Sequence, residues 1–101
     1  MNKFMMQQAQ KLQAQLLKAQ EDLANLTVEA SSGGGAVKVT MDGQQHIKSV
    51  KISPDVVNKE DVQMLEDLVL TAVKEAQTLA QDAAAKKMGG LTGGLKIPGL
   101  T

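Results

Sequence analysis

The sequence predicts an α+β domain in which a helix, three antiparallel strands and a second helix follow one another along 101 residues. Apolar residues recur every three or four positions near both ends of the chain, and they alternate with polar residues in the middle. Phe4 is the only aromatic residue, whereas a compact core normally draws on several. A short chain with so few large side chains often needs a partner chain to bury enough surface. We therefore expect a homodimer.

The first helix is expected over residues 2 to about 26. Its apolar positions are separated alternately by four and three residues, which is the 3.5-residue repeat of a coiled-coil seam. No Gly or Pro interrupts this stretch. At about 1.5 Å per residue the helix would be roughly 37 Å long, too long for a small sheet to cover. The seam comprises Met5, Ala9, Leu12, Leu16, Ala19, Leu23 and Leu26.

Two strands and a glycine-rich turn are expected next. Residues 27–30 form a short strand, residues 31–35 form the turn, and residues 36–41 form a second strand. In the second strand Val37, Val39 and Met41 fall on one face because side chains alternate along a strand. Asp42 and Gly43 then predict a two-residue hairpin turn.

The third strand is expected from about residue 44 to residue 52. Ile47 and Val50 cannot face the same side of a regular strand, so we expect a β-bulge near Lys48 and Ser49. Three strands leave two open edges, which a partner chain could close.

The second helix is expected to begin after Asn58, its predicted N-cap, and to run to about Met88. Gly89 and Gly90 are expected to end it. Residues 1–88 would then form one dimerising domain, and residues 89–101 a flexible tail rich in Gly, Pro and Leu. The seam of this helix comprises Val62, Leu65, Val69, Ala72, Ala76, Leu79 and Ala83. The two helical seams could pair within the chain, between chains, or both.

The chemistry of an enzyme is missing from this sequence. His46 is the only histidine, there is no cysteine, and the glycines at 33–35 lack the Gly-Lys-Ser/Thr ending of a phosphate-binding loop. Four acids gather near the start of the second helix: Glu60, Asp61, Glu66 and Asp67. Their position favours helix capping and solvation over metal binding. We predict no catalytic residue, no metal, no cofactor and no small-molecule substrate. No apolar stretch is long enough to span a membrane, and a cytoplasmic location is expected.

Positive charge is unevenly distributed although the net charge is zero. Residues 1–20 contain Lys3, Lys11 and Lys18 but no acid. If the two helices pair antiparallel, Lys3 and Lys11 would gather near Lys86 and Lys87, at the tip furthest from the sheet. Lysines that gather near a polyanion release its counterions, so this tip is a candidate contact for DNA phosphates.

Structural explanations compete with this reading for two of the lysines. Lys86 follows Asp82 by four residues, which is a favourable spacing for an ion pair on a helix. Lys18 has Glu21 and Asp22 close by. Both lysines could therefore be ordinary solvated residues.

The chain resembles the YbaB/EbfC family of bacterial nucleoid-associated proteins. The resemblance rests on residues 5–10 (MMQQAQ), 37–43 (VKVTMDG), 52–55 (ISPD), 60–61 (ED) and 64–69 (MLEDLV), and it extends over nearly the whole chain. It implies a homodimer with joined sheets and projecting helical arms, located in the nucleoid of the cytoplasm. It also implies binding of double-stranded DNA with low sequence specificity, and roles in gene regulation, nucleoid organisation or recombinational repair. DNA repair or replication proteins are further candidate partners.

A protein-interaction module is the alternative reading, in which the arms grip another protein, and a structural scaffold is a third. The neutral net charge and the seam rich in Met and Leu favour the interaction module. The dependence of affinity on salt distinguishes these hypotheses, because DNA binding should weaken steeply as ionic strength rises whereas an apolar contact with a protein should not.

Overall fold

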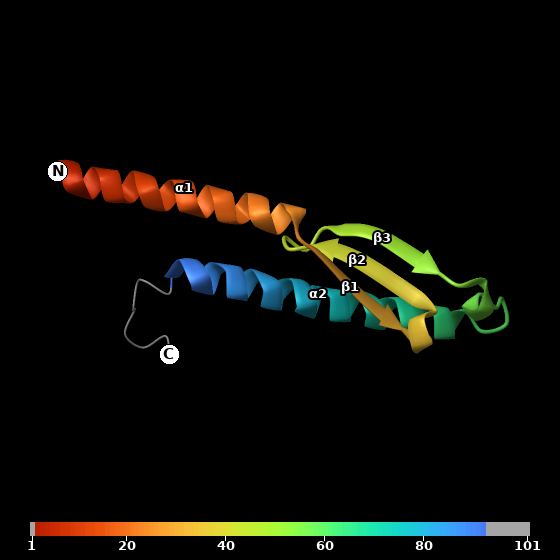
Figure 1. Cartoon of the computed structure of the whole chain (residues 1–101). Helices are drawn as coiled ribbons and strands as arrows, with labels where there is room; N and C mark the ends of the chain where they lie inside the picture. The colour runs from red at the N-terminus through yellow and green to blue at the C-terminus, as the bar shows by residue number, and fades with distance from the viewer. Residues whose placement is uncertain (1, 93–101) are drawn as a thin grey trace.

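The computed structural model describes residues 2–92 and has the predicted order of elements. Helix α1 (Lys3–Asn25) leads to strands β1 (Thr27–Ser32), β2 (Val37–Asp42) and β3 (Ile47–Ile52), and helix α2 (Val62–Thr92) follows. The strands form an antiparallel sheet in the order β1-β2-β3. Figure 1 shows α2 lying along one face of the sheet, while α1 leaves the sheet and extends beyond the end of α2.

The molecule is elongated, with principal dimensions of 69 × 27 × 17 Å. Its radius of gyration is 19.4 Å, whereas a compact domain of about 100 residues has a radius near 13 Å. None of the helices between residues 2 and 92 is both long and apolar enough to cross a bilayer.

Among the residues that the structure describes, helix α1 is packed only near its C-terminal end. It begins after Asn2, whose side-chain oxygen accepts a hydrogen bond from the Phe4 amide at 2.7 Å. Of its side chains, Ala19 and Leu23 are buried, whereas Leu12 and Leu16 are 39% and 37% exposed. The predicted helix is confirmed, and most of its seam faces solvent in the single chain.

Strand β1 is two residues longer than predicted. Ser31 and Ser32 pair with β2 instead of joining the turn, and the Ser32 hydroxyl donates to the Leu68 carbonyl of α2 at 2.6 Å. The turn is therefore confined to a 3-10 segment, Gly33–Gly35, in which all three residues have positive φ. Glycine adopts this left-handed conformation without steric cost, which explains the run of three.

The two-residue hairpin predicted at Asp42 and Gly43 is wrong. Asp42 is the last residue of β2, and β3 begins only at Ile47, so the β2–β3 loop comprises residues 43–46. The Asp42 side chain explains the longer loop. Its Oδ1 atom accepts hydrogen bonds from the amides of Gln44 and His46, at 2.8 and 2.9 Å, and the positive φ falls on Gln45.

The predicted bulge in β3 is confirmed. Thr40 pairs with Ser49 and Met41 pairs with Ile47, which leaves Lys48 as the extra residue. The bulge places Ile47 and Val50 on the same side of the sheet, as their apolar character requires.

The core lies between α2 and the first two strands. It consists of Ala30, Val37, Val39, Met41, Ala72, Ala76 and Ala80. Three alanines in one row of α2 allow the helix backbone to approach the sheet closely. Because α2 covers β1 and β2, it leaves the apolar residues of β3 uncovered on the same face: Ile47, Val50 and Ile52 are 51%, 43% and 40% exposed.

Both ends of α2 differ from the prediction. The helix begins at Val62, and the Asp61 side chain accepts from the Met64 amide at 3.2 Å, so Asp61 rather than Asn58 is the N-cap. Asn58 accepts from the Glu60 amide in the preceding turn. At the other end, the helix continues through the two glycines to Thr92. The rest of the predicted tail, residues 93–101, lies outside the described residues.

Candidate nucleic-acid interface

The three lysines of α1 lie on one side of the helix. Lys3, Lys11 and Lys18 are separated by eight and seven residues, so at 3.6 residues per turn they fall within one exposed sector. The exposed apolar residues Leu12 and Leu16 lie on a different side. Residues 2–18 contain no acid, so nothing on this helix segment offsets the positive charge.

The predicted gathering of these lysines with the end of α2 is wrong. Lys87 lies beside the C-terminal end of α1, where its Nζ atom is 3.0 Å from Oδ2 of Asp22. Lys11 and Lys3 are 11 and 19 residues further out along α1, or about 16 and 28 Å at 1.5 Å per residue. The physical reason is the length of α2. Residues 62–80 are used to cover the sheet, and only the remaining dozen residues run beside α1.

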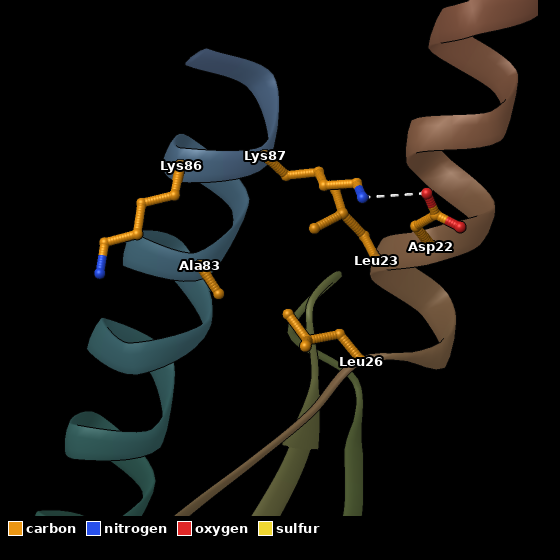
Figure 2. A pocket seen from close by; sticks show the side chains of 6 residues that line it. All are labelled: Asp22, Leu23, Leu26, Ala83, Lys86 and Lys87. Carbon is orange, nitrogen blue, oxygen red and sulfur yellow. Dashed lines mark ion pairs between the residues drawn. The ribbon is translucent and has the colours of Figure 1, made fainter. Parts of the chain in front are cut away.

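A small apolar notch marks the junction of the two helices (Figure 2). It has a volume of about 380 Å³ and is lined by Asp22, Leu23, Leu26, Ala83, Lys86 and Lys87. Figure 2 shows Lys87 reaching across to Asp22, whereas the Lys86 ammonium group points away from α1. The ion pair is partly solvated, since its side chains are 47% and 40% exposed, and such pairs typically contribute at most about 1 kcal/mol.

The predicted helical seams are used unevenly. Of the large apolar residues predicted in the seams, Leu23 is buried, Leu65 and Val69 pack against the core, and the others are exposed. The exposed ones include Leu12, Leu16, Val62 and Leu79.

The β2–β3 loop contacts the end of α1, which the sequence did not indicate. The Gly43 amide donates to the Leu23 carbonyl at 2.8 Å, and Nε2 of Gln44 donates to the Gln20 carbonyl at 3.1 Å. Asp42 supports this loop from a position that is only 2% exposed. Hydrogen bonding from the His46 amide, followed by that from Gln44, outweighs burial and holds the pKa of Asp42 below its ordinary value of 3.8.

A second basic spot lies on the open face of the sheet. Lys38 on β2 and Lys51 on β3 are directly opposite each other, and both are exposed. Like charges in this relation are unfavourable for the sheet, so an anion bound there would relieve their repulsion. Sequence reasoning missed this pair because the two lysines are neighbours only in the register that the bulge sets.

Metal binding gains no support from the side-chain arrangement. Within residues 2–92 there is no group of three or more His, Asp or Glu side chains that could hold a metal ion.

Comparisons with known proteins show which family the chain belongs to. The model of the YbaB/EbfC DNA-binding family matches residues 1–95. A nucleoid-associated protein of Pelotomaculum thermopropionicum is 53% identical over 96 residues, covering 95% of this chain and 91% of that protein. A nucleoid-associated protein of Desulforamulus reducens is 54% identical over 100 residues, covering 99% and 94%.

The fold is shared with a crystal structure of an uncharacterized Helicobacter pylori protein. The TM-score is 0.70 at 16% identity, and the match covers 94% of this chain and 97% of that one. The matched family is a DNA-binding family and not a family of enzymes, which confirms the expectation drawn from the missing chemistry. The chain belongs to the YbaB/EbfC DNA-binding family.

Proposed function

We propose that this protein is a homodimeric, nucleoid-associated protein that binds double-stranded DNA with low sequence specificity through the lysines of α1. One observation carries the proposal: the first eighteen residues of the chain hold Lys3, Lys11 and Lys18 on one exposed side of a helix and contain no acid. Membership of a DNA-binding family supports it. Roles in gene regulation, nucleoid organisation or recombinational repair would follow from such binding.

Backbone phosphates are the expected contacts. The chain has no arginine, and lysine acts as a point charge without the planar fork that reads guanine edges. Contacts to phosphate position a protein on DNA but carry little sequence information. Low sequence specificity is the consequence.

Lys86 and Lys87 would form a second group of contacts. Lys86 and Lys87 line the α1–α2 junction, and Lys18 lies one helical turn before Asp22, the partner of Lys87. Lys3 and Lys11 lie further out on the arm. A DNA duplex running along α1 could therefore meet the outer lysines and the junction lysines at different phosphates.

The homodimer is supported by the apolar surface that the single chain leaves open. Ile47, Val50 and Ile52 form an exposed row on β3, and on α2 Val62 and Leu70 are 54% and 53% exposed. A second copy that covered this row would bury the apolar surface and protect the open edge of β3. The dimer would then present two α1 arms to DNA.

The test is a titration of fluorescent duplex DNA with the protein, repeated from low to physiological salt. In the variant Lys11→Gln with Lys18→Gln, the negative slope of log affinity against log salt should become shallower. Each lost phosphate contact should reduce its magnitude by about 0.9, or about 1.8 per arm. The matched control is Lys59→Gln with Lys74→Gln, which removes the same charge from other exposed positions. The control should keep the wild-type slope.

A protein-interaction module is the second candidate, favoured by the exposed apolar stripe of α1. Met5, Leu12 and Leu16 are 61%, 39% and 37% exposed although they continue the seam of the buried Leu23. If the wild-type protein does not bind DNA even at low salt, the interaction module replaces DNA binding as the proposed function, and a protein partner is expected to contact this stripe. Equal effects of the two double variants would overturn the role of the α1 lysines.

A further inference from the structure

The end of α1 is held by hydrogen bonds from the β2–β3 loop. The Leu23 carbonyl belongs to the last turn of α1, where carbonyl groups lack partners within the helix. It accepts from the Gly43 amide at 2.8 Å and from the Leu26 amide at 3.2 Å. One turn earlier, the Gln20 carbonyl accepts from the Gln44 side chain at 3.1 Å. The loop thus contacts the helix at two successive turns.

Gly43 is required by the closeness of this contact. A Cβ atom at Gly43 would lie 2.8 Å from the Leu23 carbonyl oxygen, 2.9 Å from Leu23 Cδ2 and 3.1 Å from Leu23 Cα. Two of these atoms are backbone, so a change of side-chain rotamer cannot relieve the overlap. Gly43 is not among the positive-φ glycines, which excludes backbone conformation as the reason for glycine here.

Asp42 holds the loop in the shape that makes these contacts. Its Oδ1 atom accepts from the amides of Gln44 and His46, and its Oδ2 atom lies 3.1 Å from His46 Nδ1 and 3.7 Å from Lys48 Nζ. The carboxylate is buried, whereas His46 and Lys48 are 70% and 55% exposed. The loop therefore has an internal support that does not depend on α1.

Within residues 2–92, few other contacts set the direction of α1. The Asp22–Lys87 ion pair and the packing of Leu23 and Leu26 beside Ala83 also lie at its C-terminal end. The side chains of residues 2–18 are all exposed. The direction of the whole outer helix is thus decided within its last two turns.

We infer that the β2–β3 loop fixes the direction in which α1 leaves the sheet, and that Gly43 and Asp42 are positioning residues for DNA binding by the α1 lysines. The second half of this inference rests on the proposed function. An arm held in one direction presents its lysines to a duplex without first having to be ordered. An arm that samples several directions loses affinity in proportion to the time it spends in unsuitable ones.

The variant Gly43→Ala tests the loop directly. Residual dipolar couplings of the amides of residues 4–18 report the direction of α1 relative to the sheet and α2. In the wild-type protein one alignment tensor should fit all elements. In Gly43→Ala the α1 couplings should depart from that tensor or shrink, while those of the sheet and α2 still fit together. Gly89→Ala is the matched control, because a Cβ there meets nothing within 4 Å and the backbone φ is not positive.

A second variant guards against a general folding defect in Gly43→Ala. Gln44→Ala removes only the side-chain bond to the Gln20 carbonyl, at an exposed position. It should cause a smaller change of the α1 couplings in the same sense. Unchanged couplings in both variants would overturn the role of the loop.

DNA titration of the same proteins completes the test. If the arm of Gly43→Ala occupies its binding direction between a third and a tenth of the time, affinity should fall by about threefold to tenfold. Gly89→Ala should bind like the wild type. Altered couplings with wild-type affinity would refute the positioning role alone. Wild-type protein that does not bind DNA would refute the proposed function and with it the positioning role, while the couplings still decide whether the loop directs α1.

Discussion

Asp42 is a buried carboxylate whose two oxygens organise the loop that follows β2. Oδ1 accepts two backbone amides, and Oδ2 faces His46 and Lys48. The hydrogen bond from the His46 amide, then that from the Gln44 amide and the contact with the His46 side chain, favour the ionised form and hold the pKa of Asp42 below its ordinary value despite burial. The folded state therefore binds the Asp42 proton less readily than the unfolded chain does. Its contribution to stability is present above the unfolded pKa and is lost as pH falls through the lowered folded pKa.

Asp42→Asn should remove this acid-dependent part of the stability. The amide oxygen can still accept the two backbone hydrogen bonds, but the side chain no longer titrates. Urea unfolding followed between about pH 5 and pH 2 should show a smaller loss of stability for the variant than for the wild type. The remaining acids titrate in both proteins and cancel in the comparison. Parallel pH profiles would contradict a lowered pKa for Asp42.

At the scale of elements, the alanine row of α2 controls how closely the helix approaches the sheet. Ala72, Ala76 and Ala80 are fully buried against β1 and β2. Ala72 and Ala76 were predicted as part of a helix-pairing seam and Ala80 was not, because a period of 3.5 residues describes an apolar stripe without saying what the stripe contacts. The order of the strands and the bulge in β3 were predicted correctly since they follow from the pattern of neighbouring residues, whereas the limits of β1 and β3 were not. The hairpin was not predicted correctly, because the Asp42 side chain accepts from the Gln44 and His46 amides in a longer loop. The N-cap was not, because the Asp61 side chain caps α2 in place of Asn58.

Ala76→Leu should destabilise the fold by about 1–3 kcal/mol, since the larger side chain must push α2 away from the sheet. Urea unfolding monitored by circular dichroism measures the change. Ala85→Leu on the exposed side of the same helix is the control, and it should stay within about 0.5 kcal/mol of the wild type. Equal stability of the two variants would mean that the alanine row is not tightly packed.

At the scale of the whole molecule, the sequence predicted the parts of the candidate site but not their arrangement. The lysines of α1 are exposed as expected. Their separation from Lys86 and Lys87 could not be foreseen, because it depends on how much of α2 is used to cover the sheet. The pair of Lys38 and Lys51 likewise depends on strand register. Both arrangements arise from contacts between residues far apart in the chain, and helical or strand periodicity carries no information on such contacts.

Val50→Lys should weaken the proposed homodimer. Val50 is the middle residue of the exposed row on β3, and a buried, unpaired ammonium group in a dimer interface is costly. Sedimentation velocity at micromolar concentration should show a shift from dimer to monomer, with helix content retained. Gln81→Lys adds the same charge on the exposed side of α2 and should leave the mass unchanged. A monomeric wild-type protein would refute the homodimer itself.

The attachment of α1 through its last turns alone has a geometrical consequence. From residue 18 to residue 3 the helix extends about 22 Å beyond its last packed turn, at 1.5 Å per residue. A rotation of about 10° at the attachment would move the outermost lysine by about 4 Å, which is comparable with the rise of one base pair along DNA. Displacements at the Gly43–Leu23 contact too small to disturb the core would thus change which phosphate that lysine meets. The position of the protein along the duplex would be set at the C-terminal end of α1, far from the lysine that contacts the DNA.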